Sequence, residues 1–294
     1  MATTQSQMVA DAYTRRTGRA IELVGVTTFG DVTKAHLAQL GGTGVFVSAL
    51  RDKLIEDEVD FAVHSLKDLP TKQDPRFTLA AIPARHDHRD ALVGPHKFAD
   101  LAPGARVGTG SPRRVAMLSA LRPDLEYVPI RGNADTRIGK VASGELDAVV
   151  LAAAGLTRIG RGADVAQIFE VEELLPAPGQ GALAVECRAD RADLIEFLGV
   201  LDDPRTRAAV TAERAVLAAL EAGCAAPVGA YAADDGHTLG HTLNLTAAVV
   251  SIDGREAVRK SAAGSPSEAA NLGRLLAAEM IAEGADRLMG EHSH

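Results

Sequence analysis

Reactive and charged side chains gather where strand-like runs end, first in the stretch VHSLKDLP at 63–70. Ser65, Lys67 and Asp68 follow a buried-strand pattern here, at the edge where open α/β sheets bind ligands. A carboxylate held at such an edge can transfer protons or stabilise a cationic intermediate. Because Asp68 is next to Lys67, a surface ion pair is the alternative interpretation.

The stretch RVGTGSPRR at 106–114 has the pattern of a strand, a glycine-rich turn and a helix start. Ser111 is the expected N-cap, and Pro112 occupies the first helical position. Arg113 and Arg114 then fall in the first turn, where the helix dipole disfavours cations. This local cost indicates that the two arginines serve an anion, together with the exposed amide N–H groups. A tolerated charge on a solvated turn is the alternative.

The stretch PIRGNADTRIG at 129–139 repeats this arrangement, with Arg131 closing a strand and Arg137 in the next first turn. Asn133 or Asp135 is expected to cap that helix. The segment 106–140 has seven cationic and three acidic side chains, whereas the whole chain has a net charge of −8. Arginine binds carboxylates bidentately, so the two loops predict a cradle for a small polycarboxylic acid.

The two cysteines lie in different surroundings. Cys187 falls in the apolar strand GALAVEC, where a thiol is usually a small buried hydrophobe. Cys224 lies in LEAGCAAPVGA, in a Gly/Pro turn between a helix-like and a strand-like run. From composition alone Cys224 could be an inert turn residue. Two cysteines do not make a disulfide framework, which indicates a reducing, cytoplasmic location.

The composition excludes several classes of protein. The 294 residues contain no Trp and 3% aromatics, which argues against single-stranded nucleic acid, and the negative charge argues against non-specific DNA binding. We expect no membrane span, because the apolar runs are too short. Residues 179–184 fit a dinucleotide fingerprint but precede a strand, so we discount them. HDH at 86–88 and the terminal EHSH are expected to be polar segments, and no metal site is predicted.

The predicted elements form three groups. Helices are expected over 3–17, 45–57, 112–121, 135–142, 190–199, 204–222 and 266–284, and strands over 21–26, 60–65, 77–82, 105–109, 126–130, 147–152, 181–187, 242–250 and 255–262. Alternation over the first 200 residues is typical of a parallel α/β sheet, and the remainder reads as a smaller α+β domain.

Five stretches, in this order and at these spacings, resemble the porphobilinogen deaminase (hydroxymethylbilane synthase) family over about residues 8–260. They are VHSLKDLP, GTGSPRR, PIRGNADTRIG, LPAPGQGALAVEC and EAGCAAPVGA. The resemblance implies two doubly wound, periplasmic-binding-like α/β domains and a small α+β C-terminal domain. The expected divisions are 1–87 with 176–200, then 88–175, then 201–294.

The resemblance also implies the chemistry. Family members join four porphobilinogen molecules head to tail into hydroxymethylbilane, release ammonia and act as cytoplasmic monomers. Cys224 would carry a dipyrromethane cofactor through a thioether, and Asp68 would assist loss of ammonia and stabilise cationic intermediates. The other expected cofactor contacts are Ser65, Lys67, Thr109, Ser111, Arg113 and Arg114. The expected contacts to porphobilinogen and the growing polypyrrole chain are Asp31, Phe46, Arg131, Arg137 and Arg158.

The sequence departs from the family pattern in two places. The family's usual opening strand, with its arginine, is expected to be missing, because the sequence starts at MATTQSQMVADAY, like the following helix. The loop QLGGTGVF at 39–46 has Gln39 and Thr43 where many relatives carry lysine. Two rival hypotheses follow: a two-lobed polycarboxylate-binding protein without covalent chemistry, and an N-terminally truncated, inactive relative of the enzyme.

Overall fold

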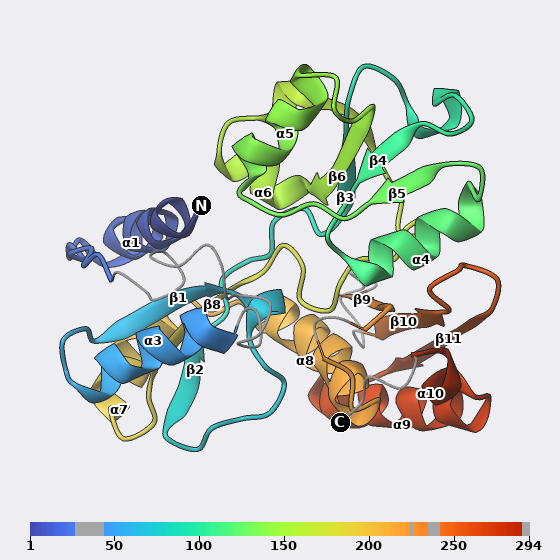
Figure 1. The fold of residues 1–294 in the computed structure, drawn as a ribbon. Coiled ribbons are helices and arrows are strands. Elements are labelled where there is room, and N and C mark those ends of the chain that lie inside the picture. The colour runs from blue at the N-terminus through green and yellow to red at the C-terminus, as the bar shows by residue number, and fades with distance from the viewer. Residues whose placement is uncertain (27–43, 224–225, 235–241, 290–294) are drawn as a thin grey trace. The chain divides into compact units, whose positions relative to one another are not determined.

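The computed structural model describes residues 1–26, 44–223, 226–234 and 242–289 (Figure 1). By its internal contacts the chain divides into two compact units. The first unit comprises Met1–Arg85 and Ala182–Arg207, and the second comprises His86–Gly181 and Ala208–His294. No helix in the described ranges is both long and apolar enough to cross a membrane.

In its described part, the first unit is an antiparallel sheet with helices on both faces. Its strands lie in the order β1 (Phe61–Ser65), β8 (Leu183–Arg188), β2 (Phe77–Ala81), and its helices are α1 (Ala2–Thr17), α3 (Gly44–Ile55) and α7 (Ala192–Gly199). Tyr13 of α1 and Leu198 of α7 share a core with Val185 on one face. Leu54 of α3 packs with Phe77 in a separate cluster. Strand β1 runs directly into a short 3-10 helix, η1 (Leu66–Asp68), so the predicted site residues follow a fixed strand.

The second unit begins with a five-stranded mixed sheet. Its strands are β3 (Asp90–Val93), β4 (Arg106–Gly108), β5 (Glu126–Val128), β6 (Ala148–Ala152) and β7 (Val165–Ile168), in the order β5-β4-β6-β3-β7. Its helices are α4 (Pro112–Leu121), α5 (Ala134–Ala142) and α6 (Ala153–Arg158), with 3-10 turns η2 (Phe98–Asp100) and η3 (Gly162–Asp164). Leu118 of α4 packs in one core with Val107, whereas Leu156 of α6 packs in another with Val149. Helices therefore cover both faces here too.

The C-terminal part of the second unit is a layer of helices on an antiparallel sheet. Its elements are α8 (Pro204–Ala219), β9 (Val228–Asp234), β10 (Leu243–Val250), β11 (Ala257–Gly264), η4 (Pro266–Glu268), α9 (Ala269–Ala282) and α10 (Ala285–Leu288), and the sheet order is β11-β10-β9. Leu245 and Val249 of β10 pack with Leu276 of α9. Val250 of the same strand packs in the core that contains Leu118. The two faces of β10 thus belong to two different cores.

The predicted α/β class with a small α+β C-terminal part is confirmed. Most of the predicted helices and strands are present at the predicted positions. The strand predicted at 21–26 is wrong: this segment is not in a sheet, and Leu23 and Val24 are 38% and 57% exposed. The parallel pairing that the alternation indicated is present only in part: β4 runs parallel to β5 and β6, whereas β8 and β3 run antiparallel to their neighbours. The three-domain division stays a prediction.

Candidate active site

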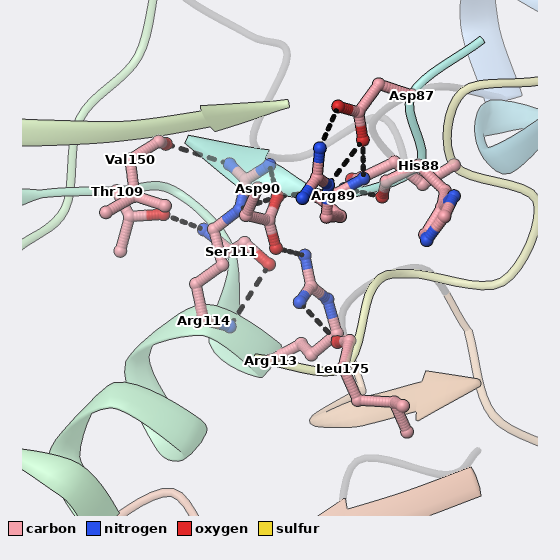
Figure 2. Close-up of polar contacts among 11 residues, drawn as sticks. Asp87, His88, Arg89, Asp90, Thr109, Ser111, Arg113, Arg114, Val150 and Leu175 are labelled. Carbon is pink, nitrogen blue, oxygen red and sulfur yellow. Dashed lines mark hydrogen bonds and ion pairs between the residues drawn. The ribbon is translucent and has the colours of Figure 1, made fainter. Parts of the chain in front are cut away.

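The turn between β4 and α4 brings two arginines onto one buried carboxylate, that of Asp90 (Figure 2). Arg113 Nη2 donates to Asp90 Oδ2 at 2.8 Å, and Arg114 donates to Oδ1 through Nε at 3.0 Å and Nη2 at 2.6 Å. Ser111 caps the helix as predicted, accepting from the Arg114 backbone N–H at 3.5 Å. The Ser111 N–H in turn donates to Thr109 Oγ1 at 3.3 Å. The cap therefore orients the arginine pair.

Carbonyl groups from distant segments hold the far ends of these guanidinium groups. Arg113 Nη1 donates to the Leu175 carbonyl at 2.6 Å, and Arg114 Nη1 donates to the Val150 carbonyl at 2.9 Å. The arginines are 3% and 5% exposed, so the alternative of a charge on a solvated turn is wrong. We name Asp90, Arg113 and Arg114 the arginine cluster.

Among the described residues, the arginine cluster has two positive charges and one negative charge. Burial would raise the pKa of Asp90, but the charges of Arg113 and Arg114 outweigh burial and hold this pKa well below its usual range. Burial lowers the pKa of Arg113, and Asp90 opposes that shift. Two guanidinium groups face one carboxylate, and the buried Nε of Arg113 has no hydrogen-bond partner in the described part of the chain. A surplus positive charge with a spare N–H fits a carboxylate ligand.

Replacing Asp90 by asparagine should destabilise the chain by about 3–5 kcal/mol at neutral pH, because two buried guanidinium groups lose their counter-charge. The pKa of Asp90 is lower in the folded chain than in the unfolded chain. The stability that its carboxylate contributes is therefore fully present above the pKa of the unfolded chain, and it is lost as the pH falls through the pKa of the folded chain. Urea unfolding of the wild type and of Asp90→Asn should therefore differ most at neutral pH and converge in acid.

Asp124→Asn is the matched control, because the Asp124 carboxylate also binds an arginine, Arg122, at 2.7 Å but is 38% exposed. We expect a much smaller loss of stability from this exposed pair. Equal losses in the two variants would contradict the importance of the buried cluster.

The other three predicted arginines lie in the same unit. Burial, and to a lesser extent the positive charge of Arg114, lower the pKa of Arg137. Arg137 Nε donates to the Gly132 carbonyl at 2.8 Å, whereas Arg131 is exposed. Arg158 Nη2 donates to the Gly181 carbonyl at 2.7 Å, and its buried Nε has no partner in the described residues. Of the predicted arginines, the structure brings Arg113 and Arg114 together on Asp90.

Gly181 is a point of close approach beside Arg158. Its φ is +88°, and a Cβ there would lie 2.6 Å from the His86 carbonyl oxygen and 2.9 Å from that of Asp87. We expect Gly181→Ala to cost about 2–5 kcal/mol in urea unfolding, from backbone strain and overpacking together. Gly160→Ala shares the positive φ of +72° but meets nothing within 4 Å, so it should cost about 1–2 kcal/mol. Equal costs would show that the close approach is unimportant.

Asp68 lies in η1, directly after β1. Its half-buried side chain makes no hydrogen bond or ion pair with the residues that the structure describes. Ser65 accepts at Oγ from Gln5 Nε2 of α1 at 2.8 Å. Lys67 is also half-buried. The Asp68 carboxylate thus lies on a fixed element, and its oxygens accept no hydrogen bond from the described residues.

A buried polar network supports the strand that leads to Asp68. Glu186 of β8 is 2% exposed and accepts from Arg51 Nη2 at 2.7 Å, and its Oε2 lies 3.2 Å from His64 Nε2. Burial would raise the pKa of Glu186, but hydrogen bonds from His64 and Arg51 lower it. The network fixes β1 against β8 one residue before Ser65.

Three predicted residues lie wholly or partly outside what the structure describes. Cys224 and Asp31 lie outside the described residues, as do positions 39–43 of the predicted loop, and the side chain of Phe46 is not described. Cys187 is fully buried, as predicted, and burial raises the pKa of its thiol.

Comparison with known proteins gives matches over almost the whole chain. The family description "Porphobilinogen deaminase, dipyromethane cofactor binding domain" matches residues 1–196, and "Porphobilinogen deaminase, C-terminal domain" matches residues 207–282. The chain belongs to the porphobilinogen deaminase family. A porphobilinogen deaminase of Thermobifida fusca is 61% identical over 304 residues, covering 99% of this chain and 93% of the relative. "Porphobilinogen deaminase 1" of Streptomyces coelicolor is 58% identical, covering 100% and 95%.

Two solved structures that match are much less similar to this porphobilinogen deaminase family member in sequence. The methionine binding protein MetQ is 10% identical, covers 68% of this chain and 84% of its own, and has a TM-score of 0.43. A periplasmic substrate-binding protein of a Coxiella burnetii ABC transporter is 12% identical, covers 70% and 89%, and also has a TM-score of 0.43.

The porphobilinogen deaminase family description names a dipyromethane cofactor, and the donor set would suit such a group if it carries carboxylates. The arginine cluster offers a surplus positive charge and the Nε of Arg113, and Arg158 offers a second Nε; neither Nε has a hydrogen-bond partner among the described residues. Arginine forks match carboxylates in geometry as well as in charge. No group of three or more His, Cys, Asp or Glu side chains placed to hold a metal is found among the described residues.

Sequence reasoning missed two residues of this site, Asp90 and Gln180. Gln180 Nε2 donates to Asp90 Oδ1 at 2.9 Å and to the His88 carbonyl at 2.8 Å, and both side chains are 0% exposed. The available signal was an acidic residue opening the apolar run DALV, where a buried carboxylate needs cationic partners. The glycines around Gln180 drew attention to a dinucleotide motif instead.

Proposed function

We propose that this protein is a hydroxymethylbilane synthase, which joins four porphobilinogen molecules head to tail and releases ammonia. The observation that carries the proposal is the arginine cluster, whose surplus positive charge and spare N–H suit carboxylates, in a member of this family. Each porphobilinogen carries an acetate and a propionate, so a growing chain presents two carboxylates for every ring.

In this proposal Arg113 and Arg114 bind carboxylates of a dipyrromethane group held on Cys224, with Ser65, Lys67, Thr109 and Ser111 as further contacts. When bound, that group supplies a covalent primer on which the chain grows. Arg131, Arg137 and Arg158, with Asp31 and Phe46, bind the incoming substrate and the growing chain. Fixed guanidinium forks hold reactants in one orientation, which lowers the entropic part of the barrier.

Asp68 is the proposed catalytic residue. As a carboxylic acid it can donate a proton to the departing amine, and as a carboxylate it stabilises the positive charge that develops on the substrate. Two features of Asp68 support this role. Its side chain is half-buried directly after β1, and its oxygens accept no hydrogen bond from the described part of the chain.

We further propose that the protein acts as a cytoplasmic monomer, and that residues 201–294 form a functional domain carrying the cofactor cysteine. The buried free thiol of Cys187 suits a reducing compartment. Sedimentation or size-exclusion chromatography of the purified protein tests this proposal, and the expected result is the mass of a single chain.

The proposed reaction has a defined stoichiometry that tests it. Purified protein incubated with porphobilinogen should release one ammonia for each porphobilinogen consumed and yield a linear tetrapyrrole, identified by its mass. Binding of porphobilinogen without release of ammonia would contradict the proposal and favour a polycarboxylate-binding protein.

A further inference from the structure

The buried carboxylate of Glu213, in the middle of α8, joins two segments that are far apart in the sequence. Its Oε2 accepts from the Gly179 backbone N–H at 2.7 Å, and its Oε1 accepts from the Ala232 backbone N–H at 2.9 Å. The side chain is 0% exposed. A buried carboxylate whose two oxygens accept from two different backbone segments fixes their separation.

The first of these segments, residues 174–181, reaches the arginine cluster. Arg113 Nη1 donates to the Leu175 carbonyl at 2.6 Å, and Gln180 donates to Asp90 at 2.9 Å. We name residues 174–181 the Gln180 segment. A shift of this segment changes the partners of both Arg113 and Asp90.

The second segment is β9, which follows the cysteine turn in the sequence. In the described sheet β9 is an edge strand, paired on one side with β10. On its other side, the Ala230 N–H donates to the Pro176 carbonyl at 3.0 Å and the Ala232 N–H donates to Glu213. The Gln180 segment and Glu213 therefore accept hydrogen bonds from two backbone N–H groups on the unpaired edge of β9.

The packing around this edge leaves little freedom. A Cβ on Gly229 of β9 would lie 2.8 Å from the Leu175 carbonyl oxygen and 2.8 Å from Met117 Cε of α4. The rings of His88 and Tyr231 stack with centroids 4.0 Å apart. Glu213 thus completes a continuous path from β9 through the Gln180 segment to the arginine cluster.

We propose that Glu213 is a positioning residue, which sets the strand after Cys224 at a fixed place relative to the arginine cluster. The inference rests on the proposed function, in which Cys224 and these arginines hold the same group. In that proposal the group is attached covalently to Cys224 and bound through its carboxylates by the arginines. The attachment point and the arginines must therefore lie at a fixed distance and orientation. Glu213 acts through the backbone of both segments and touches no reactant in this account.

The test compares Glu213→Gln with Leu276→Ala, using intact mass, thermal unfolding and steady-state kinetics on the purified full-length chains. In Glu213→Gln one carboxylate oxygen becomes an NH₂ group that faces a backbone N–H, so one bond is lost. We expect the fraction of chains with the added mass of the cofactor to fall about tenfold, and kcat per loaded chain to fall at least tenfold. The KM for porphobilinogen should stay within about twofold of the wild type.

Leu276→Ala is the matched control, because Leu276 is 0% exposed in the core that also contains Ala212 and Val216 of α8. It should lower the melting temperature while leaving the loaded fraction and kcat of folded chains unchanged. Should Glu213→Gln fail to fold, Glu213→Asp replaces it, since aspartate keeps the charge but is too short to hold both N–H groups at once. The same losses, reduced in size, are then expected.

Wild-type loading and kcat in the Glu213 variant would overturn the inference, and so would equal losses in Leu276→Ala at the same loss of melting temperature. A wild-type chain that never carries the added mass would instead contradict the proposed function, and this inference with it. The two failures are therefore distinguishable.

Discussion

Replacing Cys224 by serine is expected to abolish turnover of porphobilinogen. The proposed attachment needs a thiolate, and a serine hydroxyl ionises far less readily than a thiol. Leu220, Ala222 and Val228, on either side of this position in the sequence, belong to a buried core whose side chains the change leaves intact. Activity should fall below detection in assays of ammonia release, while the melting temperature of the unloaded chain remains close to that of unloaded wild type.

Cys187→Ala is the control for this prediction. Cys187 is fully buried in β8, and burial raises the pKa of its thiol, which keeps it protonated and unreactive. This variant is expected to lose some stability and to keep its turnover per folded chain. Full activity in Cys224→Ser, or its loss in Cys187→Ala alone, would contradict the assignment of the cofactor to Cys224.

Replacing Asp68 by alanine is expected to lower kcat by about 10²–10⁴, the range for loss of a general acid or an electrostatic stabiliser. Cofactor attachment should persist, because the predicted anchor is Cys224. Since Asp68 makes no hydrogen bond or ion pair with the described chain, the free energy of unfolding should change by no more than about 0.5 kcal/mol. The measurements are kcat, intact mass and urea unfolding of one preparation.

Asp60→Asn is the matched control for Asp68→Ala, because Asp60 immediately precedes β1 and its side chain is 70% exposed. It should leave kcat within about twofold of the wild type. A near-normal kcat in Asp68→Ala would reduce Asp68 to a surface carboxylate and leave the proposed chemistry without its acid.

Local signals in the sequence predicted the position of the arginine cluster but could not predict its structure. Ser111 and Pro112 marked the start of α4, and the cost of Arg113 and Arg114 in its first turn indicated an anion. In the structure, the anion that binds both arginines is the Asp90 carboxylate. Asp90 lies 23 residues before Arg113 and 24 residues before Arg114 in the chain. Such a partner is set by sheet order, which local patterns do not encode.

The errors in the fold have a similar origin. Alternation of helices and strands predicted a parallel sheet, yet β3 and β8, which begin just after the points where the chain passes between its two units, run antiparallel to their neighbours. The segment 21–26 has strand-like composition, but a strand also requires a neighbour, and no described strand pairs with it. Strand direction and pairing are tertiary properties, whereas helix ends are set by nearby residues.

The intact mass of the purified 294-residue chain, followed by peptide mapping, tests the central claim most directly. We predict an added mass equal to two linked pyrrole units, located on the peptide that contains Cys224 and absent from Cys224→Ser. The bare mass of the chain, or an added mass on any other peptide, would contradict the account.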